Sequence, residues 1–324
     1  MLSAYSLSSG QLSPGAISDG VERAVWVDLL EPTREEERQV EQSTGLAVPT
    51  REEMAEIEIS NRLYEEDGAS FATVSLLVGA SADKPALTPV TFILKGERLL
   101  TVRYSPVRAF EAFTLQACRP VGQRFSGSVA VLLGLMEAVV NRLADTLEQS
   151  GVSLDIMAQN IFEEESRFRR AEVRDFRNVL RRLGRKGDML SKARESLVSL
   201  GRMTAFLSAI IEADAAHKEN RTRLKSIGRD IAALTDHVSY LTGRISLLLD
   251  ATLGLINMEQ NGIIKIFSVA AVIFLPPTLV ASIYGMNFEH MPELRWMLGY
   301  PFALIMMVAA AVLPYVYFKR KGWL

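Results

Sequence analysis

The sequence has few of the residues that build crosslinks and metal-dependent active sites. Its 324 residues include one cysteine, Cys118, and three histidines that lie far apart. A single cysteine excludes an intramolecular disulfide and a metal site built from several cysteines. Three separated histidines also argue against a histidine-based catalytic zinc site.

An excess of one charge is missing as well. The 36 basic and 38 acidic residues give a formal net charge of −2. Nucleic-acid-binding domains generally carry a basic excess, so we expect no nucleic-acid partner. No phosphate-binding glycine loop, nucleophile elbow or paired catalytic motif occurs in the sequence. We therefore expect neither enzymatic activity nor an organic cofactor.

Long apolar runs are absent from the first 262 residues, and two then follow close together. The N-terminal stretch MLSAYSLSSG lacks a basic region and an apolar core, so we expect no secretory signal peptide. The runs at 263–284 and 299–318 each suffice for a membrane helix. The first, at 1.5 Å per residue, would be about 33 Å long and could cross a hydrocarbon core of about 30 Å. We predict two transmembrane helices near the C-terminus.

Basic residues around these runs predict their orientation. Lys319, Arg320 and Lys321 follow the second run, whereas Arg295 is the only Lys or Arg between the runs. By the positive-inside rule the tail lies in the cytoplasm, and two crossings place the long N-terminal part there too. We expect a protein of the inner (cytoplasmic) membrane with both termini cytoplasmic.

A long helix is predicted to lead into the first membrane segment. Apolar positions alternate at spacings of 3 and 4 from Leu224 to Leu255, and no proline interrupts residues 215–275. This pattern predicts one helix over 218–284, on the order of 100 Å long. Its apolar seam must be covered by other helices of the same chain or by copies of the chain. The sequence leaves both alternatives open.

One face of the first membrane segment is apolar with polar positions at its ends. A Thr or Ser in lipid can hydrogen-bond its own helix backbone, so each polar residue alone indicates little. Combined with a terminal Asn287, the stripe is typical of a pore lining, and apolar constrictions of that kind gate by losing water. The stripe comprises Ile264, Phe267, Ala271, Leu275, Thr278 and Ser282, with Asn261 just off it on the cytoplasmic side.

The segment between the runs carries a family resemblance. IYGMNFEHMPELRW, followed by GYP, a second apolar run and a basic tail, resembles the CorA family of divalent-cation channels. The likeness is closest over 258–324, and 25–46 and 88–107 resemble that family's first strand and helix and its hairpin. The resemblance implies a funnel-shaped homopentamer. It further implies a selectivity filter of Gly285, Met286 and Asn287 and a pore lined by Asn261, Ile264, Phe267, Leu275 and Thr278.

The chemistry of Mg²⁺ fits a neutral filter. Because this ion keeps several waters, a ring of Asn287 amide oxygens could accept hydrogen bonds from them without binding the ion tightly. Met286 favours magnesium or cobalt, since relatives that favour zinc tend to carry Ile there. Glu289 and Glu293 would concentrate cations at the pore mouth, although ordinary solvated loop charges explain them equally well. His290 is expected to be only an exposed polar residue.

The N-terminal part is predicted to be an α/β domain with a small mixed sheet and long helices. Strands are expected near 24–29, 60–66, 70–78, 88–95 and 97–103, and helices near 33–44, 107–117, 127–165 and 171–213. Glu163, Glu164 and Glu165 precede an arginine-rich stretch, and a solvated face explains them better than cation sensing. The resemblance makes Asp250 a candidate cytoplasmic cation sensor.

Together these patterns predict a pentameric divalent-cation channel, with Mg²⁺ uptake into the cytoplasm favoured. The alternatives are a zinc-, cobalt- or nickel-permeable channel of the same family, and a membrane-tethered sensor or scaffold without transport. The partners expected are copies of the chain, membrane lipid and divalent cations. The predicted parts are the cytoplasmic domain with its helical layer (1–215), the stalk (216–262), the pore-lining helix (263–284), the external loop (285–298), the second membrane helix (299–318) and the basic tail (319–324).

Overall fold

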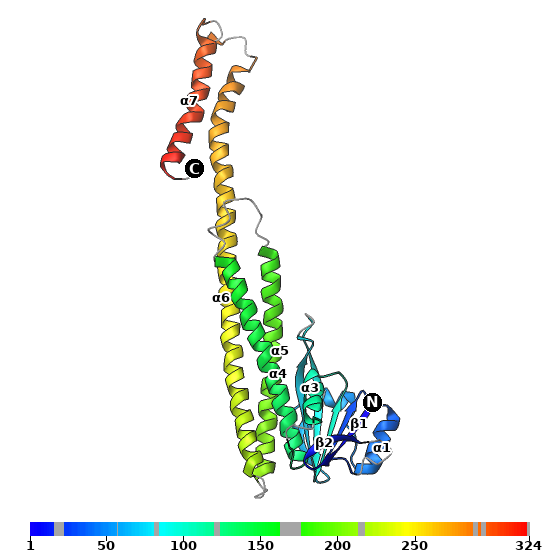
Figure 1. The fold of residues 1–324 in the computed structure, drawn as a ribbon. Helices are drawn as coiled ribbons and strands as arrows, with labels where there is room; N and C mark the ends of the chain where they lie inside the picture. Colours follow the sequence, from blue (N-terminus) through cyan, green and yellow to red (C-terminus); the bar gives the residue numbers. More distant parts are fainter. Residues whose placement is uncertain are drawn as a thin grey trace. The chain divides into compact units, whose positions relative to one another are not determined.

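The chain divides into two units, Met1–Leu249 and Asp250–Leu324. The first unit holds a β-sheet and most of the helices, and the second holds two apolar helical segments (Figure 1). The computed structural model describes residues 1–15, 23–56, 58–80, 84–119, 124–162, 176–212, 218–287, 291–292 and 296–322.

The first unit contains a seven-stranded mixed sheet with the strand order β2-β1-β3-β7-β6-β5-β4. Only β3 and β7 pair in parallel, and the other neighbours are antiparallel. The small mixed sheet of the sequence analysis is thus confirmed. The strands are β1 Leu2–Ser8, β2 Gln11–Gly15, β3 Trp26–Leu30, β4 Leu63–Glu66, β5 Ala69–Val78, β6 Ala86–Lys95 and β7 Arg98–Arg103.

The first two strands were not predicted, so the segment at 25–46 supplies the third strand of the chain rather than the first. Strands β1 and β2 form a hairpin whose turn residues, Ser9 and Gly10, both have positive φ, at 53° and 82°. Two such residues give the tight turn that suits the twist of a hairpin. A Ser-Gly dipeptide between two short segments was the available signal.

Helices cover both faces of the sheet, and most begin and end within a few residues of the predicted positions. Helix α1 starts at a capping box in which Thr33 and Glu36 bond each other's backbone N–H groups. Val40 of α1 joins the core on one face, while Phe110 of α3 contacts Trp26 and Phe92 on the other. The helices are α1 Arg34–Thr44, α2 Arg51–Met54, α3 Arg108–Ala117, α4 Ser128–Phe162, α5 Phe176–Glu212, α6 Lys218–Tyr284 and α7 Gly299–Arg320, with a 3₁₀ turn at Ile59–Asn61.

Ion pairs fix the register between α4 and the first part of α6. Arg223 binds Glu137 through two hydrogen bonds of 3.0 and 2.8 Å, and Arg244 lies 2.6 Å from Asp155. The hydrogen bond with Asp155 raises the pKa of Arg244. Both pairs advance in the same direction along the two helices, so α4 and α6 run parallel.

The apolar seam of α6 is buried within the chain. The side chains from Leu224 to Leu248 at the seam spacing are nearly inaccessible, apart from the half-buried Leu234, and Leu241 is 1% exposed. Contacts come from α4 and α5: Gly151 lies beside Leu241 and Gly201 beside Ile231. Of the two alternatives for the seam, cover by the same chain therefore holds for this stretch.

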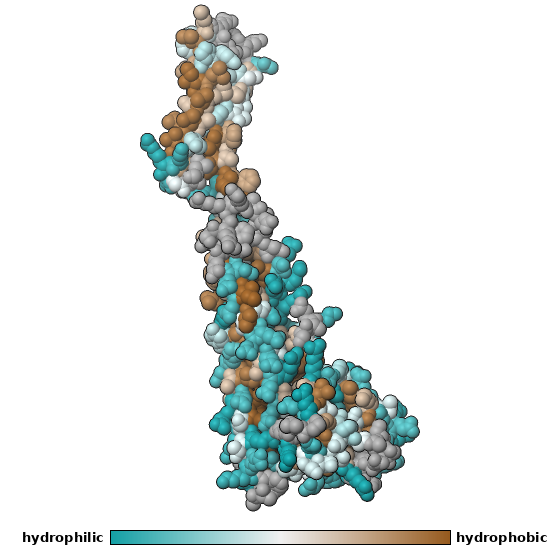
Figure 2. Space-filling view, viewed as in Figure 1, coloured by the Kyte–Doolittle hydropathy of each residue, from teal (hydrophilic) through white to brown (hydrophobic). Residues whose placement is uncertain are grey.

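The second unit contains apolar helix that the protein itself hardly covers. Helices α6 and α7 each include a stretch long and apolar enough to cross a membrane, and only 6% of each stretch is buried. Figure 2 shows hydrophobic side chains over the surface of this unit. A core helix of a soluble protein would be mostly buried, so these stretches fit a lipid environment. Pro276 and Pro277 lie inside α6 without ending it.

Candidate functional site

The last part of α6 has one covered face, on the side of α7. Val269 is 3% exposed, and half-buried residues follow it at helical spacing along α6. The corresponding face of α7 begins at Gly299 and Ala303, which are both buried. The half-buried residues of this face of α6 are Ile273, Pro276, Val280 and Tyr284, and those of α7 are Met306, Met307, Ala310, Ala311, Pro314 and Phe318.

The predicted pore-lining stripe lies on the opposite face of α6. At 100° per residue, its centre is about 180° from the centre of the covered face. Phe267 is 72% exposed and Leu275 is 65% exposed. The stripe therefore remains open to further partners when α7 is in place. Its members, Ile264, Phe267, Ala271, Leu275, Thr278 and Ser282, are all exposed in the single chain.

Asn261 is exposed too, but it lies about 80° from the centre of this stripe. The side chain of Thr278 hydrogen-bonds its own helix, because its hydroxyl donates to the carbonyl of Phe274 at 2.7 Å. This bond is the local one that a threonine in lipid commonly makes. It uses the hydroxyl proton and leaves the oxygen able to accept a hydrogen bond from outside.

Helix α6 ends at the segment Gly285–Met286–Asn287. The Gly285 N–H donates to the carbonyl of Ala281 at 3.0 Å, and the Met286 N–H to that of Ile283 at 3.3 Å. A Cβ at Gly285 would lie 3.2 Å from the Ala281 oxygen, so glycine suits this tightly wound end. Asn287 follows as an exposed residue with no hydrogen-bond partner among the described residues. Its amide is therefore exposed just beyond the C-terminal end of α6, five residues after Ser282, the last residue of the stripe.

The remaining predicted sites are divided between described and undescribed residues. Asp250 is exposed on α6. The side chains of Glu289, His290, Glu293 and Glu163–Glu165 lie outside the described residues. Within the described part of the chain, no group of three or more His, Cys, Asp or Glu side chains is placed to hold a metal ion.

The model of the family described as CorA-like Mg²⁺ transporter protein matches residues 21–320. The chain belongs to the CorA family. Membership in a family of transport proteins confirms the prediction that the chain is not an enzyme. Together with the two apolar helices, it also identifies a membrane protein.

Two curated CorA relatives match along their whole length. The magnesium transport protein CorA of Escherichia coli K12 is 36% identical over 326 residues, and that of Pectobacterium atrosepticum is 37% identical over 327 residues. In both cases the match covers 100% of this chain and 100% of the relative.

Solved structures confirm the fold of a full-length CorA protein. The CorA magnesium transporter from Methanocaldococcus jannaschii matches with a TM-score of 0.75 at 18% identity, over 100% of this chain and 99% of that one. The full-length CmaX protein matches with a TM-score of 0.73 at 14% identity, over 100% and 98%. The ZntB cytoplasmic domain from Vibrio parahaemolyticus RIMD 2210633 covers 79% of this chain and 98% of its own, with a TM-score of 0.57 at 10% identity.

The sequence analysis did not predict which face of α6 is covered by α7. The available signal was a set of small residues in the second apolar helix, since Gly299, Ala303 and Ala310 lie at spacings of 4 and 7. Without the second helix in place, the covered and open faces of α6 could not be distinguished by hydropathy, because both are apolar.

Proposed function

We propose that the chain forms a homopentameric channel that carries Mg²⁺ into the cytoplasm. The observation that carries the proposal is the exposed stripe on α6, which lies opposite the α7 face and is followed, beyond the end of the helix, by the exposed Asn287. The printed function of the E. coli and P. atrosepticum relatives, magnesium transport, supports the choice of ion.

The geometry supports an inner ring of α6 helices and an outer ring of α7 helices. If α7 covers one face of α6, copies can meet only through the remaining surface. A stripe about 180° from the α7 face would then point toward a shared axis, and α7 would face lipid. Phe267 and Leu275 would form apolar rings, where a hydrated ion passes only when the pore is filled with water.

The polar ends of the stripe suit a hydrated cation. The waters around Mg²⁺ present hydrogen atoms outward, so the wall of a filter should supply acceptors. The Asn287 amide oxygen is one acceptor, and the Thr278 oxygen is another because its proton is already bonded to Phe274. Neutral acceptors hold such an ion less tightly than carboxylates would, which permits release.

The division of the chain follows from this assembly. We place 1–215 and the stalk 216–262 in the cytoplasm and 263–284 and 299–318 across the inner membrane, with 285–298 outside and the tail 319–324 cytoplasmic. The tail carries Lys319, Arg320 and Lys321, which supports a cytoplasmic C-terminus.

Uptake by proteoliposomes tests the filter. Purified full-length protein is reconstituted in vesicles containing a fluorescent Mg²⁺ indicator, and uptake is driven by an inside-negative potential. Asn287→Ala should reduce the initial rate about tenfold or more, since about 1.4 kcal/mol at the barrier gives that factor. Asn141→Ala, at an exposed position of α4, is the matched control. Uptake by the Asn287→Ala protein at the wild-type rate would show that the filter is misassigned.

The same vesicles distinguish the other candidate functions. Larger flux with Zn²⁺, Co²⁺ or Ni²⁺ than with Mg²⁺ would favour a channel for those ions. An absence of flux with every ion, from protein that elutes as a pentamer, would favour a tethered sensor or scaffold.

The charged residues around the pore have separate tests. Glu289→Gln and Glu293→Gln should reduce uptake at low ionic strength and lose their effect at high salt, because salt screens exposed charges. Asp250→Asn should weaken inhibition by Mg²⁺ loaded inside the vesicles if Asp250 senses the cytoplasmic ion. Inhibition identical to that of the wild type would exclude Asp250 from sensing.

A further inference from the structure

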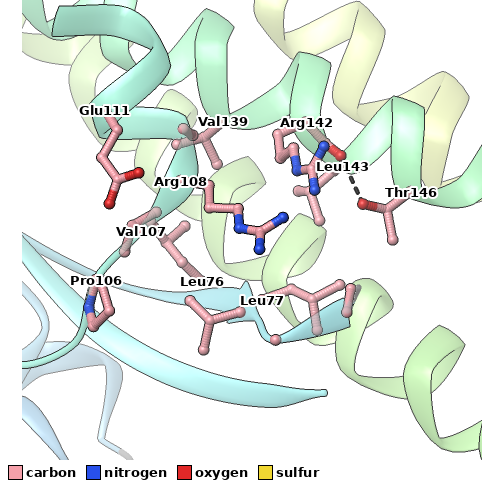
Figure 3. Close-up of a pocket in the computed structure, with 14 residues that line it drawn as sticks. Leu76, Leu77, Pro106, Val107, Arg108, Glu111, Val139, Arg142, Leu143 and Thr146 are labelled. Carbon is pink, nitrogen blue, oxygen red and sulfur yellow. Dashed lines mark hydrogen bonds between the residues drawn. The ribbon is translucent and has the colours of Figure 1, made fainter. Parts of the chain in front are cut away.

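A cavity of about 360 Å³ lies in the first unit where the sheet meets the helices (Figure 3). Its walls come from the end of β5, the start of α3 and the middle of α4. Small-molecule sites commonly occupy about 300–1,000 Å³. The cavity therefore has room for a small ligand.

Positive groups from two helices face this cavity. Figure 3 shows the guanidinium of Arg108, from α3, in the middle of the cavity, with the guanidinium of Arg142, from α4, beside it. Among the residues that the structure describes, no carboxylate forms an ion pair with Arg108. Glu111 also lines the cavity, but its carboxylate lies apart from the two guanidinium groups.

The start of α3 adds to this positive field. Helix α3 has Val107 as its N-cap, which supplies no side-chain hydrogen bond to the first N–H groups. Uncapped N–H groups at a helix start carry partial positive charge. Two like-charged guanidinium groups beside them favour an anion, and a guanidinium binds carboxylate and phosphate oxygens with two parallel hydrogen bonds.

Aliphatic side chains form much of the remaining wall of the cavity, which also includes Thr146. Leu76, Val139 and Leu143 are buried, and Leu77 is half-buried. None of the described residues that line the cavity is aromatic, so they offer a nucleobase no ring to stack on. An alkyl chain, by contrast, gains from contact with such a wall at about 25 cal/mol per Å² of apolar area removed from water.

We propose that this cavity binds an anionic amphiphile with a single short alkyl chain. Its carboxylate or phosphate head contacts Arg108 and Arg142, and its chain lies against Leu76, Val139 and Leu143. A free fatty acid and a lysophospholipid share this chemistry. The site is independent of the ion pathway, so it stands or falls separately from the proposed transport function.

Binding of radiolabelled decanoate tests the site directly. Full-length protein is placed in phosphatidylcholine nanodiscs and equilibrated with decanoate, and binding to empty nanodiscs is subtracted. We expect saturable binding, weakened at least about tenfold by Arg108→Gln and by Arg142→Gln, because a hydrogen bond to a charged group contributes about 1.5–3 kcal/mol. Arg34→Gln, at an exposed position of α1, should bind decanoate like the wild type.

Further probes separate the roles of head and chain. Decanol lacks the charge and inorganic phosphate lacks the chain, so both should bind more weakly than decanoate. Octanoyl lysophosphatidate binding more tightly than decanoate would assign the site to a lysophospholipid, and the reverse order to a free fatty acid. Thermal unfolding of each variant confirms its fold. The absence of saturable binding, equal binding of decanol, or wild-type affinity in a folded Arg108→Gln protein would overturn the proposal.

Discussion

Replacement of Gly134 by alanine should destabilise the first unit, although alanine is the better helix former. Gly134 is buried in α4 opposite the ring of Phe113 in α3. A Cβ there would lie 2.6 Å from Cε2 of Phe113 and 3.1 Å from Cε1 of Phe125. Carbon atoms prefer about 3.5–4.0 Å, so the Phe113 ring would have to retreat by about 1 Å.

The surroundings leave this ring little room to move. Phe113 packs edge-on against Trp26 and Phe125, with ring centroids 5.7 and 5.6 Å apart. Overpacking a core typically costs about 1–3 kcal/mol, while alanine gains about 1 kcal/mol over glycine in a helix. Because the Phe113 ring is held on two sides, we expect a cost in the upper part of that range, about 2–3 kcal/mol, which leaves a net loss of about 1–2 kcal/mol. At about 2–4 °C per kcal/mol for a domain of this size, the melting temperature should fall by about 2–8 °C.

Thermal unfolding of the full-length protein in one detergent, followed by circular dichroism, measures this change. Gly184→Ala is the matched control, because a Cβ at this exposed position of α5 meets nothing within 4 Å. This control should gain up to about 1 kcal/mol in stability. Adding Phe113→Leu to Gly134→Ala removes the colliding ring atoms and should recover part of the loss.

The outcome also bears on the cavity beside α3 and α4. Close approach at Gly134 sets the distance between the helices that carry Arg108 and Arg142, so Gly134→Ala should also weaken decanoate binding. If Gly134→Ala raises the melting temperature as much as Gly184→Ala does, the argument from close packing is wrong.

Two further substitutions and one pH dependence test other parts of the fold. Leu241→Ala should lower the free energy of unfolding by about 2–5 kcal/mol, because the side chain is 1% exposed. Leu247→Ala, at a position that is 63% exposed, should change it by no more than about 0.5 kcal/mol. Equal shifts in thermal unfolding for the two variants would contradict cover of the seam by the same chain. The buried guanidinium of Arg103 lies 2.7 Å from the Asp28 carboxylate, and Asp28→Asn removes this counter-charge. The free energy of unfolding, measured with denaturant, should fall by about 3–5 kcal/mol. A loss below about 1 kcal/mol would refute this. Partial burial raises the pKa of Glu36, but hydrogen bonds from the capping residue and the N-terminal amine outweigh it and leave the pKa below the ordinary 4.5. A lowered folded pKa stabilises above the unfolded pKa, so the gain over Glu36→Gln should vanish as the pH falls below about 4; a constant difference would argue against it.

The arrangement of the two membrane helices could be predicted only in part. The sequence indicated both apolar runs, and an uninterrupted helical pattern predicted α6 with the bounds Lys218–Tyr284 that the structure has. It also indicated an apolar stripe with polar ends on α6 and an asparagine, Asn287, just beyond the helix. Hydropathy could not show which apolar face α7 covers, because a lipid-facing and a helix-facing side chain have the same polarity.

In the first unit, too, some elements could be predicted from the sequence and others could not. The capping box at Thr33 and the strands from β3 onward follow patterns that repeat within a few residues, so the sequence alone determined them. Strands β1 and β2 are short and rich in serine, and they form because β3 offers an edge to pair with. Their existence was therefore decided by pairing with a distant segment.

Sequence alone determined the helix that leads into the membrane, the two apolar runs and the Gly-Met-Asn segment, because each depends on local spacing or on composition. Tertiary structure decided that α4 and α5 cover the seam of α6, that the stripe faces away from α7, and that Arg108 meets Arg142 in one cavity. These features join residues far apart in the chain, and such contacts form only when whole faces pack together.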